Sequence, residues 1–82
     1  MQVPGEYFDD RRHYAVTVVS LTCAECLVCG AREHAAPGTP VRCFIGAVGP
    51  IPGKAGGTSG DRLRIRFLRP IDDLIVSHFA AC

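Results

Sequence analysis

Residues 62–69, with the sequence Arg-Leu-Arg-Ile-Arg-Phe-Leu-Arg, give the clearest indication of the fold. Apolar residues alternate with arginines, and a period of two residues is that of a β-strand with one buried face and one wet face. The wet face carries a stripe of guanidinium groups from Arg62, Arg64, Arg66 and Arg69. The segment therefore predicts a strand that is apolar on one side and strongly basic on the other.

The period changes after this strand. From Pro70 to Cys82 the apolar residues recur at helical spacing, Pro70 suits a first helical turn, and Asp72 and Asp73 place negative charge near the positive end of a helix. We expect a C-terminal helix that packs on the sheet. A strand through residues 74–79 stays an alternative, because Ile75 and Val76 favour one.

The remaining segments predict two further strands. Residues 13–21 are rich in β-branched side chains, and residues 41–48 form a shorter apolar run between Pro/Gly segments. Residues 1–12 read as a loosely ordered N-terminal arm and residues 49–60 as a flexible Gly-rich loop. The fold class predicted is α+β: one small three-stranded, mostly antiparallel sheet with a C-terminal helix and a cysteine-rich knuckle between the first two strands.

Four of the five cysteines and one histidine fall within residues 23–43. The C-x2-C-x2-C spacing can supply two thiolates from one turn, and zinc prefers four tetrahedral sulfur or imidazole ligands. The predicted ligands are Cys23, Cys26, Cys29, His34 and Cys43. A second C-x2-C pair is missing, so a distant cysteine and a histidine would have to complete the zinc site.

Three alternatives to a zinc site stay open for the cysteines. The spacing also begins the bacterial iron–sulfur motif, although Glu33 stands where that motif has its fourth cysteine. The cysteines can instead be buried, reduced thiols, since free cysteine is among the most buried residue types. A disulfide among them, or one that involves Cys82, is the third alternative.

Length and composition exclude several classes of protein. The 82 residues suffice for a single small domain, and a net charge of +1 selects no partner by itself. The chain has no apolar run of membrane-spanning length and no secretory signal pattern, and an odd cysteine count fits a reducing compartment, so we expect a cytoplasmic protein. The segment at Gly53-Lys54 does not match the phosphate-binding loop motif, because Ala55 stands where the motif has the Ser or Thr that ligates magnesium.

These features predict a non-enzymatic binding module, with zinc fixing the cysteine loop, that contacts an anionic partner through the arginine strand. Nucleic acid and an acidic protein surface both qualify as partner, although no aromatic side chain suited to stacking on bases lies on the arginine face. The alternative is a metal-free interaction or inhibitor protein, of the size of small viral or phage proteins, that acts through an exposed strand or the C-terminal helix.

Overall fold

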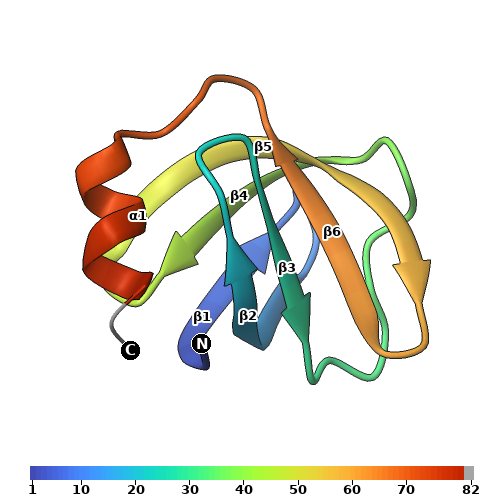
Figure 1. Cartoon of the computed structure of the whole chain (residues 1–82). Helices are drawn as coiled ribbons and strands as arrows, with labels where there is room; N and C mark the ends of the chain where they lie inside the picture. Colours follow the sequence, from blue (N-terminus) through green and yellow to red (C-terminus); the bar gives the residue numbers. More distant parts are fainter. Residues whose placement is uncertain (81–82) are drawn as a thin grey trace.

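The computed structural model describes residues 1–80, which form an antiparallel β-barrel and one short helix (Figure 1). In chain order the elements are β1 (Val3–Phe8), β2 (His13–Leu21), β3 (Glu25–Cys29), β4 (Pro40–Ile45), β5 (Val48–Ser59), β6 (Arg62–Phe67) and α1 (Asp73–Ala80). The strands follow the order β1-β2-β3-β6-β5-β4 around the barrel, and pairing of β1 with β4 closes it.

The predicted three-stranded α+β fold is wrong, because the sheet has six strands and is closed. Residues 3–8 of the expected arm form β1, and residues 48–59, expected as a flexible loop, form the longest strand, β5. The cysteine-rich segment expected as a knuckle between two strands contains a strand of its own, β3. Closure gives every described strand two neighbours, although short stretches such as residues 13–16 of β2 are paired on one side only, because the β2–β3 ladder begins at Thr17.

Other predictions are confirmed. Residues 13–21 form β2, and residues 62–67 form β6, which has the alternating burial that its sequence pattern indicates. The strand predicted at 41–48 is β4, which begins at Pro40 and ends at Ile45. The C-terminal segment is helical from Asp73 to Ala80, whereas the helical position expected for Cys82 lies outside the described residues.

Strand β5 explains why a Gly-rich segment is part of the barrel. Its inward positions alternate with exposed prolines and lysine, and the buried residues are Ile51, Gly53 and Ala55. A Cβ at Gly53 would lie 2.6 Å from the carbonyl oxygen of Arg66, so only glycine lets β6 approach this closely. The register shifts between Ala55 and Thr58, which places a bulge at the Gly-Gly pair.

The interior of the barrel is filled by apolar side chains, and no charged or polar residue is buried among the described residues. The largest fully buried side chains are Tyr7, Ile45, Leu63, Ile65, Val18, Val28 and Cys26.

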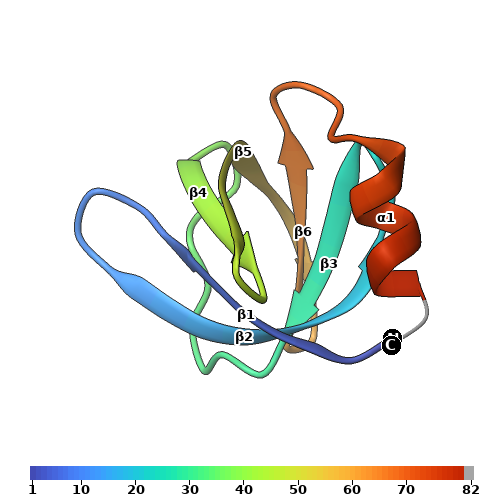
Figure 2. The same ribbon diagram turned by 90° about the vertical axis from the view of Figure 1, so that its left-hand side faces the viewer.

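Helix α1 packs next to β2 at the side of the barrel and buries Phe79 (Figure 2). The Asp72 carboxylate accepts a hydrogen bond from the Leu74 amide at 2.8 Å and caps the helix. No helix in residues 1–80 is long and apolar enough to cross a membrane.

One hydrogen-bonded chain fastens the long connection between β3 and β4 to the barrel. The buried Tyr7 hydroxyl accepts from the Ala35 amide at 3.1 Å and donates to His34 Nδ1 at 2.8 Å. His34 Nε2 donates in turn to the Asp61 carbonyl oxygen at 2.7 Å, in the turn between β5 and β6. Because the Asp61 carbonyl oxygen can only accept, the network places a proton on His34 Nε2.

Replacing Tyr7 with phenylalanine is expected to lower the free energy of unfolding by about 1–3 kcal/mol, because the buried Ala35 amide loses its acceptor. Urea unfolding measures this loss. Burial raises the pKa of Tyr7 from 10.0 to about 12, so the folded state holds this proton more tightly than the unfolded chain. Stability of the wild type should therefore fall as pH rises from 10 to 12, and the variant should lack this component.

Tyr14→Phe is the matched control. The Tyr14 ring stacks on Tyr7 with centroids 4.5 Å apart and keeps this contact after loss of its hydroxyl. Its unfolding free energy should change by less than about 0.5 kcal/mol. Equal losses in the two variants would contradict the structural role assigned to the Tyr7 hydroxyl.

Candidate functional site

The outer face of three neighbouring strands, β4, β5 and β6, carries a concentration of positive charge. Five of the nine Lys and Arg residues lie there, all exposed. They are Arg42 on β4, Lys54 on β5, and Arg62, Arg64 and Arg66 on β6. No Asp or Glu lies on these three strands. We call this surface the basic face.

Strand register places these cations side by side. Lys54 lies directly opposite Arg66, and Arg42 lies opposite Pro52, one outward position along β5 from Lys54. Sequence reasoning found the β6 arginines but missed Lys54, which it assigned to a loop, and Arg42. Arg69, which was predicted to join them, lies beyond the end of β6 in the connection to α1.

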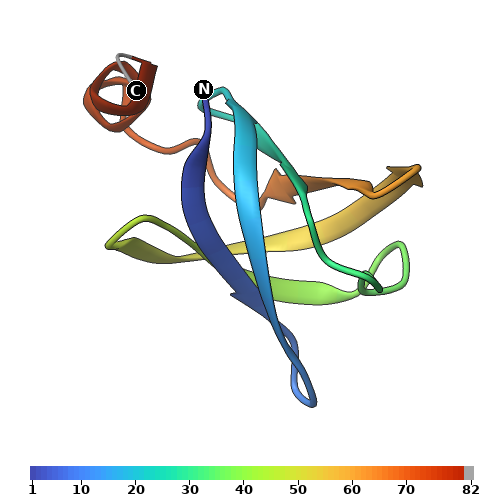
Figure 3. The same ribbon diagram turned by 90° about the horizontal axis from the view of Figure 1, so that it is seen from below.

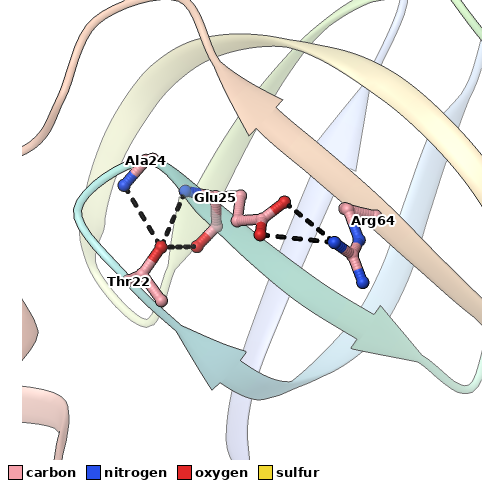
Figure 4. Close-up of polar contacts among 4 residues, drawn as sticks. All are labelled: Thr22, Ala24, Glu25 and Arg64. Atoms are coloured by element: carbon pink, nitrogen blue, oxygen red, sulfur yellow. Dashed lines mark hydrogen bonds and ion pairs between the residues drawn. The ribbon is translucent and has the colours of Figure 1, made fainter.

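A single carboxylate marks the β3 border of the basic face. Glu25 lies opposite Arg66 in the register of β3 and β6, and its side chain approaches Arg64 Nη1 at 3.4 Å (Figure 4). Because both side chains are substantially exposed, this ion pair contributes little to stability. Its main effect is to offset part of the positive charge of Arg64.

The predicted zinc ligands are not brought together. In β3 successive side chains point to opposite faces, so Cys26 is buried inside the barrel while Cys29, three residues on, lies on the outer face. A C-x2-C pair can share a metal in a turn but not along a strand. Within residues 1–80, no three His, Cys, Asp or Glu side chains form a group that could hold a metal ion.

The remaining predicted ligands have different roles. Cys23 lies in a tight turn that the Thr22 hydroxyl holds, accepting from the amides of Ala24 at 3.2 Å and Glu25 at 3.1 Å (Figure 4). The Cys23 carbonyl oxygen accepts a hydrogen bond from the Ile71 amide at 2.8 Å. His34 uses both ring nitrogens in the Tyr7 network, so it has no lone pair left for a metal.

Cys26 and Cys43 meet inside the barrel. They lie on the inner faces of β3 and β4, both 2% exposed, and are free thiols that interact with each other. The hydrogen bond between the two thiols, together with burial, raises the pKa of Cys26. Cys26 therefore stays protonated at neutral pH in this core environment.

A groove of about 490 Å³ lies between the β1–β2 hairpin and the connection after β3. Its lining includes Arg12, His13, Arg32 and Glu33. Arg12 Nη1 contacts Glu33 Oε2 at 2.6 Å, so positive charge in this groove is already partly compensated. The basic face has more uncompensated charge and is the stronger candidate site.

Comparison with protein-family models and with curated proteins gives no match for this chain.

Alkylation of the folded protein should separate the cysteines of residues 1–80 into two classes. Cys23 and Cys29 are partly exposed and should react first, whereas Cys26 and Cys43 should react only after unfolding. Peptide mass spectrometry after timed labelling measures the rates. Added zinc should leave the rates at Cys23 and Cys29 unchanged, and protection of both residues by zinc would contradict their separation in the structure.

Proposed function

We propose that this protein is a non-enzymatic binding module that contacts an anionic partner through the basic face. The observation that carries the proposal is the presence of five exposed cations and no carboxylate on β4, β5 and β6. An ordinary solvated strand face mixes both charge signs, as happens where Glu25 on β3 lies beside Arg64. Zinc is not part of the proposal, since no ligand group supports it among residues 1–80.

The geometry suits a partner with regularly spaced negative groups. Outward residues of one strand are about 6.7 Å apart, so the β6 arginines form a straight row of guanidinium groups on a rigid barrel wall. Lys54 adds one further cation beside this row, opposite Arg66. Arginine forks bind phosphate and carboxylate oxygens in pairs, and the paired strands fix the spacing of the backbone positions that carry them.

The alternative of a metal-free inhibitor has less support. Strand addition needs an open edge, and the described strands form a closed barrel in which only short stretches, such as residues 13–16 of β2, are paired on one side. On α1 the exposed large apolar residue is Leu74, which is too small an area for a stable protein interface. Electrostatic contact through the basic face therefore remains the function that the geometry supports best.

The double variant Lys54→Gln/Arg66→Gln should weaken binding to inorganic polyphosphate and to a single-stranded oligonucleotide, and should reduce the slope of log K against log salt by about 2. Fluorescence anisotropy over a salt series measures both. The control is Arg32→Gln, which removes one positive charge from an exposed position outside the basic face and should leave the slope nearly unchanged. No binding of the wild type to either polyanion would refute the proposal.

A second variant should act in the opposite direction. Glu25→Gln removes the carboxylate that offsets Arg64, so polyphosphate should bind about 2- to 5-fold more tightly at low salt. The turn should persist, because its hydrogen bonds use the Glu25 backbone and not the side chain. Fluorescence anisotropy measures the affinity, and weaker binding by this variant would show that Arg64 needs Glu25 for its position.

A further inference from the structure

We propose that the anionic partner is a single-stranded nucleic acid, one base of which enters a pocket beside the basic face while the adjacent phosphates lie on Lys54 and Arg42. This inference rests on the proposed function and adds to it a recognition site for a base that carries an amino group. It depends on closure of the barrel, which brings β1 next to β4 and so places Phe8 opposite Arg42. The sequence alone predicted no aromatic side chain beside the arginines.

The pocket has a volume of about 190 Å³, which suits one nucleobase. The β1–β2 hairpin, which projects from the barrel (Figures 2 and 3), forms one wall, and β4, β5 and Leu68 form the others. Its lining residues are Phe8, Asp9, Asp10, Pro40, Val41, Arg42, Pro52, Gly53 and Leu68.

Apolar surface around this pocket is left exposed. Leu68 is 60% exposed although it is anchored by a hydrogen bond from its amide to the Pro52 carbonyl oxygen at 3.1 Å. Pro40 and Pro52 are also exposed, and Phe8 is half-buried. A planar base is a ligand that can cover rigid apolar walls of this kind, because each of its faces stacks on rings and aliphatic groups without needing a fixed sequence of contacts.

An aromatic group and a cation lie at the entrance. The Arg42 guanidinium carbon is 5.6 Å from the centre of the Phe8 ring, and the Phe44 ring stacks behind Phe8 with centroids 6.0 Å apart. Aromatic rings and arginine planes are the groups on which unpaired bases stack in proteins that bind single strands. Arg42, backed by the Phe8 ring, therefore supplies both a stacking surface and a phosphate contact.

Two carboxylates in the pocket determine which bases fit. Asp9 Oδ1 accepts hydrogen bonds from the amides of Arg11 and Arg12, both at 2.8 Å, which lower the Asp9 pKa and keep it ionised. Asp10 is exposed, and no hydrogen bond or ion pair of its side chain occurs within residues 1–80. Carboxylates repel phosphate but accept hydrogen bonds from amino groups of cytosine, adenine or guanine. The base, and not the backbone, is thus the group that this end of the pocket accepts.

The phosphates have a continuous path from the pocket to the basic face. Pro40 in the pocket wall lies opposite Lys54 across the β4–β5 pair, and Lys54 lies opposite Arg66. A strand that leaves the pocket at Arg42 therefore meets Lys54 and then the β6 arginines. Double-stranded nucleic acid is a poorer fit, because its bases are paired and stacked and cannot enter the pocket.

The test compares an oligocytidine of about 12 nucleotides with inorganic polyphosphate of the same charge, by fluorescence competition at constant salt. The full-length wild type should bind oligocytidine more tightly than polyphosphate and more tightly than an oligothymidine of equal length. Phe8→Ala and Leu68→Ser should each weaken oligocytidine binding about 5- to 50-fold and leave polyphosphate binding unchanged.

Leu74→Ser is the matched control for Leu68→Ser, since Leu74 is also an exposed leucine, on α1 and away from the pocket. Its affinity for both ligands should match that of the wild type, and thermal unfolding identifies any variant that fails to fold. Two results would overturn the base pocket but not the basic face. One is that Leu68→Ser loses affinity for oligocytidine and for polyphosphate to the same extent. The other is that the wild type binds these two ligands with equal affinity. Binding of an acidic peptide but no oligonucleotide would do the same. Failure of every polyanion to bind would overturn the proposed function as well.

Discussion

The pairing of β1 with β4 is the constraint on which the rest of the structure depends. A ladder from Gly5 opposite Ile45 to Phe8 opposite Arg42 joins the first strand of the chain to the fourth and turns a curved sheet into a barrel. Without this ladder Tyr7 would lose its buried position, and the β3–β4 connection that it anchors would lose its partner. The same ladder places Phe8 beside Arg42, so one long-range pairing creates both the core and the surface pocket.

The alternation of side chains along each strand then decides which groups lie inside the barrel and which lie on its outer face. Because side chains in a strand point alternately to the two faces, residues an even number apart share a face and residues an odd number apart do not. This rule gathers Arg62, Arg64 and Arg66 on the outside, where their charges reinforce one another. It also places Cys26 and Cys29 on opposite faces. A C-x2-C metal site needs a turn or loop that brings its two thiolates together, so these two cysteines cannot form one.

The same rule explains what the sequence could and could not predict. Strand β6 was predictable because its alternation is local and regular, and β2 because β-branched side chains are concentrated in it. Strand β5 was not, because a small barrel needs glycine where strands approach closely, as at Gly53, and glycine and proline are also the composition of loops. Strand β1 was missed for a different reason: its stability comes partly from pairing with β4, far along the chain, which no local pattern records.

The candidate site, like the fold, could be predicted from the sequence only in part. The β6 arginines could be found from sequence because they lie within one strand, whereas Lys54 and Arg42 join them only through register between strands. Tyr7, Cys26 and their apolar neighbours occupy the interior of the barrel. The proposed recognition therefore uses the outer wall of the barrel. On such a surface, affinity depends on how many charges act together and on whether a shallow apolar pocket can hold one flat group, and the described residues provide both within three adjacent strands and one hairpin.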